Sequence, residues 1–202
     1  LPSNEIINAA LRTEKKMYPE VAIREFVANA LIHQDLSISG SGVMIEIFDD
    51  RIEITNPGSP LIDVDRFIDH PPRSRNESIA GLMRLIGICE EGGTGIDRAL
   101  INIGIYQLPA PKFETYENST RITMYAYKDL KDMSTDDKVR ACYQHAVLMH
   151  LQDKNMTNES LRERLGISKS NYPAASSIIR AALDKKVIKE ADRPKEYVPM
   201  WA

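Results

Sequence analysis

The chain has 202 residues, 43% of them hydrophobic and 27% charged, with a formal net charge of −3 at pH 7, which suits one medium and one small globular domain. The sequence contains no apolar run long enough to span a bilayer, and no signal peptide, internal repeat or metal-type Cys/His cluster is recognisable. Two distant cysteines, Cys89 and Cys142, indicate a reducing compartment, so we expect a cytoplasmic protein without membrane contact. The first residue is Leu1 rather than Met, and we therefore expect a piece of a longer protein or a processed form.

The first predicted helix carries a polar stripe. It spans about Arg24 to Asp35, and within it Glu25, Asn29 and His33 are spaced four residues apart and share one face. Polar side chains on an otherwise buried helix are costly unless they meet a ligand or a metal, which favours a site here. The alternative is the solvated outer face of an amphipathic helix.

A β-hairpin is predicted next. Residues 43–48 and 51–55 alternate and are rich in β-branched side chains, with a short polar turn between them. The second strand ends at Thr55 and is followed by Asn56, Pro57 and Gly58. An Asn side chain at such a break can face a pocket.

A proline-containing segment follows the hairpin and precedes another predicted helix. Arg73 and Arg75 come after a Pro-Pro break, and Asn76 is placed to cap a helix over residues 77–86. An arginine beside a helix cap can reach a phosphate. The alternative is that both arginines, like His70, are ordinary solvated residues of a surface loop.

Glycines and a threonine open the next predicted helix, which runs to about Ile103. Gly93, Thr94 and Gly95 allow tight turns and a close approach of the backbone to a ligand. Free N–H groups and the positive end of the helix dipole favour a phosphate at this point. The alternative is a plain turn from loop to helix.

The pattern becomes polar after strands predicted from about Lys112 and over residues 121–127, and we place a domain boundary between residues 132 and 133. Three helices and two short strands are expected beyond it. The helices are predicted over 138–152, from Thr157 or Asn158 to Gly166, and from Ser168 to about Lys185, and the strands over 187–189 and 197–199.

Four separated motifs between residues 15 and 127 occur in a recognisable order: REFVANALIHQD, IEITNPG, RNESIAGL and EEGGTGIDR. This part of the chain resembles the GHKL ATPase superfamily, which has an α/β sandwich of the Bergerat type. More narrowly, it resembles the ATP-binding-like segment of bacterial and archaeal transcriptional regulators called RecG-related. In those regulators a Schlafen/AlbA-like N-terminal domain usually precedes the segment.

The resemblance implies an adenine-nucleotide site that uses ATP and Mg²⁺. Glu25 corresponds to the general base that polarises the attacking water, and Asn29 to the magnesium ligand, an oxygen donor suited to a hard cation. Asn56 lies where the superfamily usually has an Asp that accepts a hydrogen bond from the adenine amino group. Residues from about 58 to 92 correspond to a mobile segment over the nucleotide, here called the lid. The implied cofactor-binding residues are Asn29, His33, Asn56, Gly58, Arg75, Gly93, Thr94 and Gly95.

Three positions depart from the superfamily pattern. Asn56 replaces the Asp, although an amide oxygen can still accept a hydrogen bond. Pro60 stands where a second glycine is common, and His33 stands where many members have another residue type. These departures bear on activity more than on fold, because function depends on the site.

The C-terminal elements resemble a winged helix-turn-helix domain, carried by the segment LRERLGIS, the helix after it and the two final strands. In such a module the second helix of the pair enters the DNA major groove, so we expect contact with double-stranded DNA. Lys169 suits a phosphate and Asn171 a base edge. The alternative is a winged helix that docks on protein. The expected DNA-binding residues are Ser168, Lys169, Ser170, Asn171, Tyr172, Arg180, Arg193 and Lys195.

Charge is divided unevenly between the two parts. Residues 134–202 hold twelve Lys/Arg against nine Asp/Glu, and the rest of the chain holds fourteen against twenty. Because residues 134–202 are modestly basic and the rest of the chain is acidic, the C-terminal part is where nucleic acid would bind. Phosphate contacts alone would give weak affinity, so a homodimer or an upstream domain would help.

The sequence thus predicts an α+β protein with a GHKL-type domain over residues 1–132 and a winged helix over residues 133–202. The predicted function is a DNA-binding transcriptional regulator with a nucleotide-binding, or formerly nucleotide-binding, module. Two alternatives remain open. One is an active magnesium-dependent ATPase that the winged helix only positions, and the other is a catalytically dead GHKL fold that serves as a dimerisation scaffold.

Overall fold

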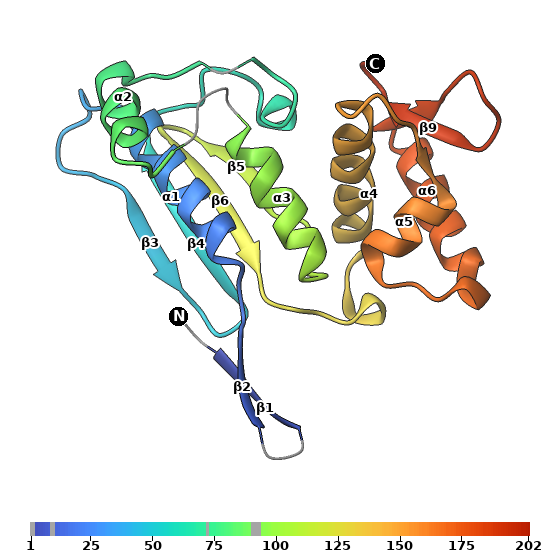
Figure 1. The fold of residues 1–202 in the computed structure, drawn as a ribbon. Helices are drawn as coiled ribbons and strands as arrows, with labels where there is room; N and C mark the ends of the chain where they lie inside the picture. The colour runs from blue at the N-terminus through green and yellow to red at the C-terminus, as the bar shows by residue number, and fades with distance from the viewer. Residues whose placement is uncertain (1–2, 9–10, 72, 90–93) are drawn as a thin grey trace.

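The computed structural model describes residues 3–8, 11–71, 73–89 and 94–202, and it consists of a helix-covered sheet followed by a second group of helices around a smaller sheet (Figure 1). Among the described residues, no helix combines the length and the apolar character needed to cross a bilayer. The strands are β1 (Ser3–Asn8), β2 (Leu11–Lys16), β3 (Met44–Ile47), β4 (Arg51–Pro57), β5 (Lys112–Tyr116), β6 (Ser119–Tyr125), β7 (Met156–Thr157), β8 (Ile188–Glu190) and β9 (Glu196–Pro199). The α-helices are α1 (Glu20–His33), α2 (Glu77–Leu85), α3 (Gly95–Ile105), α4 (Thr135–His150), α5 (Asn158–Leu165) and α6 (Tyr172–Asp184), and the 3₁₀ turns are η1 (Val64–Arg66), η2 (Leu130–Asp132) and η3 (Lys169–Asn171).

The larger sheet is antiparallel, with the strand order β3-β4-β6-β5. The predicted hairpin is confirmed, because β3 and β4 pair with Met44 opposite Thr55 and Ile47 opposite Ile52. β4 continues two residues beyond the predicted end, and Asn56 pairs with Thr120 of β6. Asn56 is therefore held by a central strand of the sheet.

Helices α1 and α3 cover this sheet. Phe26 of α1, Ile54 of β4 and Ile103 of α3 are almost fully buried in one apolar cluster. Burial of an apolar side chain of this size contributes about 1.5–3 kcal/mol. This packing fixes the rotation of α1 and therefore the direction of its polar stripe.

An additional hairpin lies at the N-terminal end, where the sequence predicts no strand. β1 and β2 pair antiparallel, with Ser3 opposite Lys16 and Asn8 opposite Leu11. In Figure 1 this hairpin extends away from the four-stranded sheet. Neither segment alternates apolar and polar residues, and so the pattern that normally predicts a strand is missing.

The C-terminal residues form α4, α5 and α6 around a sheet of order β7-β9-β8. Cys142, Leu161, Ile179 and Ile188, one from each of α4, α5, α6 and β8, are buried in a cluster of their own. The order of the three helices and of β8 and β9 agrees with the prediction, whereas β7 was not predicted. Whether the unit acts as a winged helix remains a prediction.

In the C-terminal unit, two helix starts differ from the prediction. α4 begins at Thr135 rather than at residue 138, because Ser134 Oγ accepts from the Asp137 N–H and the Asp137 carboxylate accepts from the Ser134 N–H. The helix expected from Ser168 begins only at Tyr172, after the turn η3. Pro173 lies in the first turn of α6, where its fixed φ is favourable and no N–H is needed.

Candidate functional site

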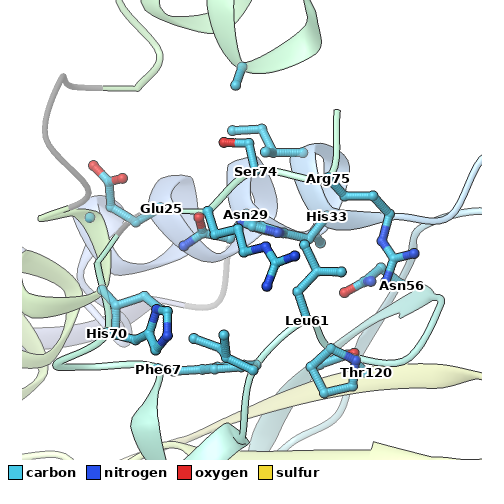
Figure 2. Close-up of a pocket in the computed structure, with 18 of the residues that line it drawn as sticks. Glu25, Asn29, His33, Asn56, Leu61, Phe67, His70, Ser74, Arg75 and Thr120 are labelled. Carbon is cyan, nitrogen blue, oxygen red and sulfur yellow. The ribbon is translucent and has the colours of Figure 1, made fainter. Parts of the chain in front are cut away.

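A cavity of about 240 Å³ lies between α1, the sheet and the lid. Figure 2 shows Glu25, Asn29 and His33 in a row along α1 at this cavity. The polar stripe therefore lines an enclosed space rather than a fully solvated helix face. Other residues at the cavity include Asn56, Phe67, His70, Arg73, Arg75 and Gly95.

Glu25 is a buried carboxylate beside the start of α3. It is 3% exposed, and Arg24 Nη2 donates to its Oε1 at 3.1 Å. Gly95 is the first residue of α3, and a Cβ at this position would come within 2.6 Å of Glu25 Oε2. The N-terminus of α3 and the Arg24 guanidinium therefore both lie beside the Glu25 carboxylate.

Asn56 offers a hydrogen-bond acceptor at the other end of the cavity. The residue is 4% exposed, and its Nδ2 donates to the Pro57 carbonyl at 3.2 Å. Because a carbonyl can only accept, this contact fixes the orientation of the amide, which the positions of its atoms alone would leave open. Oδ1 is then available as an acceptor for a ligand, and Nδ2 keeps a second hydrogen.

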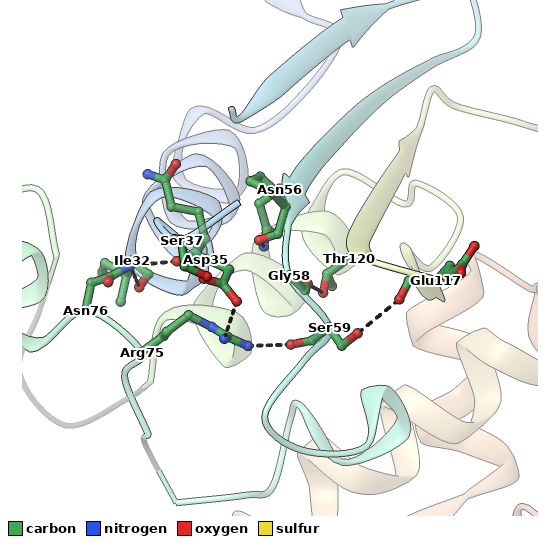
Figure 3. Close-up of polar contacts among 12 residues, drawn as sticks. Ile32, Asp35, Ser37, Asn56, Gly58, Ser59, Arg75, Asn76, Glu117 and Thr120 are labelled. Carbon is green, nitrogen blue, oxygen red and sulfur yellow. Dashed lines mark hydrogen bonds and ion pairs between the residues drawn. The ribbon is translucent and has the colours of Figure 1, made fainter. Parts of the chain in front are cut away.

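The turn after β4 requires a glycine at position 58. Gly58 has φ +101°, and a Cβ there would meet Asp35 Cβ at 2.8 Å. The Asp35 N–H donates to the Pro57 carbonyl at 2.8 Å, and the Thr120 hydroxyl donates to the Gly58 carbonyl at 2.9 Å (Figure 3). Gly58 is not among the described residues that line the cavity, and it shapes the wall through these contacts.

Arg75 ties the lid to the rest of the domain. Its Nη1 donates to Asp35 Oδ2 at 3.2 Å, and its Nη2 donates to the Ser59 carbonyl at 2.5 Å (Figure 3). The side chain is 23% exposed and also lines the cavity. The alternative in which Arg75 is an ordinary solvated loop residue is therefore wrong.

Asn76 has a different role from the predicted helix cap. It precedes α2, but its side chain makes no capping hydrogen bond to that helix. Its Nδ2 donates instead to the carbonyls of Ile32 and Gln34, at 2.9 and 2.8 Å. These carbonyls lie at the C-terminal end of α1, where backbone carbonyls have no N–H partner within the helix. Asn76 thus holds the lid against α1.

His33 lies in an apolar and cationic environment. Burial and the nearby Arg75 guanidinium lower the pKa of His33 below its ordinary value. The neutral imidazole has one nitrogen that donates and one that accepts. His33 can therefore offer either kind of hydrogen bond to a ligand without adding charge.

The lid contributes three further residues to the cavity. The sequence did not single out Phe67, whereas His70 and Arg73 are exposed, as the surface-loop alternative predicts, and also line the cavity. Phe67, His70 and Arg73 all line the cavity, and the Phe67 ring lies 5.5 Å from the Phe113 ring of β5. Of these three residues, only Arg73, which follows two prolines in the sequence, was considered as a possible ligand contact. Their common placement depends on how the lid folds back, which local periodicity does not report.

The remaining predicted residues lie elsewhere. Gly93 falls outside the described residues, and Thr94 precedes α3 without lining the cavity in the part of the chain that is described. The residues expected to contact DNA are exposed and belong to the C-terminal unit. Ser168, Lys169, Ser170 and Asn171 lie at η3, Tyr172 and Arg180 on α6, and Arg193 and Lys195 between β8 and β9.

A magnesium ion fits the donor set only if a ligand brings most of the oxygens. Among the described residues, no group of three or more His, Cys, Asp or Glu side chains could hold a metal ion. Asn29 offers one neutral oxygen at the cavity, and Mg²⁺ commonly takes one or two protein ligands together with phosphates and water. The residues present therefore suit a nucleotide-bound Mg²⁺ rather than an ion held by the protein alone.

The fold and the cavity define an ATPase-like domain, in which one helix brings Glu and Asn to a cavity and a second helix starts at a glycine beside them. Residues 40–124 match the family described as "Putative ATP-dependent DNA helicase recG C-terminal". The match includes three of the four motifs and confirms the resemblance there, so these residues form a RecG-related, GHKL-type ATPase-like domain. The motif that holds Glu25 and Asn29 lies before the matched residues.

One solved structure shares the fold over nearly the whole chain. The DIP2311 protein from Corynebacterium diphtheriae superposes with a TM-score of 0.58 at 17% identity and covers 98% of this chain. This chain spans only 42% of that protein's length. At this identity the likeness concerns the fold alone, and no curated protein matches the chain.

Proposed function

We propose that the chain binds an adenine nucleotide with Mg²⁺ in the cavity under the lid, and that it regulates transcription by binding double-stranded DNA through a winged helix over residues 133–202. The observation that carries the nucleotide proposal is the cavity itself. It brings together Glu25 and Asn29 from α1, Asn56 from β4 and Gly95 from α3. These residues come from three motifs that lie far apart in the sequence.

The two ends of the cavity suit the two ends of a nucleotide. At one end, Asn29 and the N-terminus of α3 favour phosphates and their Mg²⁺. At the other end, the Asn56 Oδ1 atom accepts from an exocyclic amino group. Arg73 and Arg75 place guanidinium groups on the lid side, and guanidinium groups pair well with phosphate oxygens.

The proposal for DNA depends on the exposed face of α6. Tyr172, Ser176 and Arg180 are exposed and follow one another at four-residue spacing along this helix. The preceding turn adds Lys169, and the connection between β8 and β9 adds Arg193, whose side chain is 82% exposed. The polar helix face suits contacts with base edges, and the cations beside it suit contacts with phosphates.

Selectivity for the base tests the nucleotide proposal. A guanine would present a carbonyl oxygen where adenine presents its amino group, and two acceptors would then face each other at Asn56. We expect the protein to bind ATP about tenfold more tightly than GTP, the factor that corresponds to one unmade buried hydrogen bond. Calorimetric titration of both nucleotides measures this ratio.

Asn56→Ala should abolish the difference between ATP and GTP. Asn118→Ala is the matched control, because Asn118 is an exposed residue of the turn between β5 and β6. Equal affinities for ATP and GTP in the unmodified protein would refute the proposed role of Asn56.

A further inference from the structure

One stretch of the lid, residues 64–70, is docked on the C-terminal unit. Ile68 is 7% exposed and packs with Leu100 of α3 and Val147 of α4 in a small apolar cluster. Figure 1 shows the segment around η1 reaching toward α4 and the chain's C-terminus. This docked segment, as residues 64–70 are called below, therefore belongs to the lid by sequence and to the C-terminal unit by contact.

Two aromatic residues outside the cavity hold the docked segment. The Tyr143 hydroxyl donates to the Asp65 carbonyl at 2.7 Å, and Trp201 Nε1 donates to the Tyr143 hydroxyl at 3.3 Å. The Arg66 guanidinium carbon lies 4.6 Å from the centroid of a Trp201 ring. Arg66 Nε also donates to the Asp69 carboxylate at 2.8 and 2.9 Å, which fixes the cation over the indole.

The same segment carries cavity residues on its other side. Phe67 and His70 line the cavity, within five residues of the carbonyl that Tyr143 binds. Further along the lid, Arg75 and Asn76 hold it against the end of α1. The described residues of the lid are thus held near Asp65 and Arg66 by the C-terminal unit, and at Arg75 and Asn76 by the ATPase-like domain.

We infer that Tyr143 and Trp201 are positioning residues for the cavity, and that the docking of the C-terminal unit sets nucleotide affinity through the docked segment. This inference rests on the proposed nucleotide site. Neither residue touches the cavity in the described structure, so each acts through Asp65 and Arg66 on the placement of Phe67 and His70.

A consequence follows for the two proposed ligands. If docking of the segment favours nucleotide binding, then nucleotide binding favours docking by the same factor, because coupling free energies are reciprocal. A DNA or protein partner that pulls α4 or the C-terminal residues away from the docked segment would weaken nucleotide binding. The lid contact therefore provides a physical route between the two ends of the molecule.

The test compares Tyr143→Phe with the unmodified chain in two measurements. Tyr127→Phe is the matched control, because its hydroxyl bonds Asp129 at 3.0 Å and lies outside the lid contacts. Amide hydrogen exchange, recorded without nucleotide, reports the protection of residues 64–70 and of the cavity residues 73–75. Calorimetric titration with ATP and Mg²⁺ reports affinity, and thermal melting checks that each variant is folded.

We expect Tyr143→Phe to raise exchange in both stretches and to weaken ATP binding by about three- to tenfold, the effect of losing one net hydrogen bond at the contact. Tyr127→Phe should change neither quantity. Trp201, the one tryptophan of the chain, adds a spectroscopic readout, because its emission should shift when ATP and Mg²⁺ bind to the unmodified protein and shift less in Tyr143→Phe.

Three results would overturn the inference. Unchanged exchange in Tyr143→Phe would show that the hydroxyl does not hold the lid. Raised exchange with unchanged ATP affinity would show that docking is not coupled to the cavity. An unmodified chain that binds no ATP would refute the nucleotide proposal and its coupling, whereas the exchange data would still decide whether Tyr143 positions the cavity residues of the lid.

Discussion

The Arg75 guanidinium lies 3.2 Å from the Asp35 carboxylate, so the lid is paired with the segment just beyond the end of α1. Both side chains are partly buried, at 23% and 29% exposed. Arg75→Ala should lower the free energy of unfolding by about 1 kcal/mol, the upper range for a screened ion pair with an added carbonyl contact.

Urea denaturation measures this change, with Arg193→Ala as the control for losing an exposed arginine. We also expect Arg75→Ala to weaken ATP binding, because the guanidinium lines the cavity. A variant as stable as the unmodified protein and equal in ATP affinity would contradict the role assigned to the pair.

Glu25 is the side chain placed to act as a general base if the protein hydrolyses ATP. A positioned base commonly contributes a factor of about 10²–10⁴, so Glu25→Gln should lower any Mg²⁺-dependent phosphate release by at least about a hundredfold while nucleotide binding persists. Glu20→Gln on the same helix is the control, because Glu20 is exposed and pairs with Lys16. Phosphate release that Glu25→Gln leaves unchanged would come from a contaminant or from another base.

The sequence predicted the parts of the site that follow a local repeat. Glu25, Asn29 and His33 share a face because the helix has a fixed period, and Asn56 directly follows a predicted strand whose alternation is clear. The hairpin of β3 and β4 was predictable for the same reason.

The parts that failed depend on contacts between distant segments. Asn76 has the sequence context of a helix cap, but its amide reaches α1 more than 40 residues upstream in sequence. His70 is exposed, as predicted for a surface loop, and its additional place at the cavity follows from the docking of the lid on Val147 and Trp201. The late start of α6 has a different cause. A proline at position 173 is compatible with a helix start at several neighbouring positions, so the sequence does not fix the first residue of α6.

Asp97 should make stability depend on pH. Burial and the Asp69 carboxylate raise the pKa of Asp97 from 3.8 to about 6, in spite of its favourable place in the first turn of α3. A raised carboxyl pKa means that the folded state binds the proton more tightly, so this contribution to stability is present below pH 3.8 and lost as pH rises through 6.

Asp97→Asn should therefore leave stability similar near pH 4 and raise it above pH 6, by about 1 kcal/mol after allowance for solvent screening of a half-buried group. Thermal melting at pH 4.5 and pH 8 measures the difference, with Asp192→Asn as an exposed control. A gain of the same size at both pH values would mean that the charge of Asp97 is not responsible.

The DNA proposal separates two kinds of contact. Lys169→Ala should weaken binding of all duplex sequences alike and reduce the salt dependence, because one released counterion is lost. Asn171→Ala should change the preference at a base position instead. Fluorescence anisotropy with labelled duplexes at several salt concentrations measures both effects, and Lys154→Ala, an exposed lysine in the loop after α4, is the control. Absence of DNA binding at low salt would favour a protein-docking winged helix.

The central claim is that the cavity binds ATP together with Mg²⁺, and calorimetric titration of the purified chain tests it most directly. We predict saturable binding of ATP that requires Mg²⁺, is weaker for GTP, and falls by about tenfold or more in Asn29→Ala, since that variant loses the oxygen that we propose as a ligand of the ion. ADP provides the comparison for the contribution of the terminal phosphate. No heat of binding at millimolar ATP with Mg²⁺, from a protein shown to be folded, would contradict the account and leave the domain as a structural scaffold.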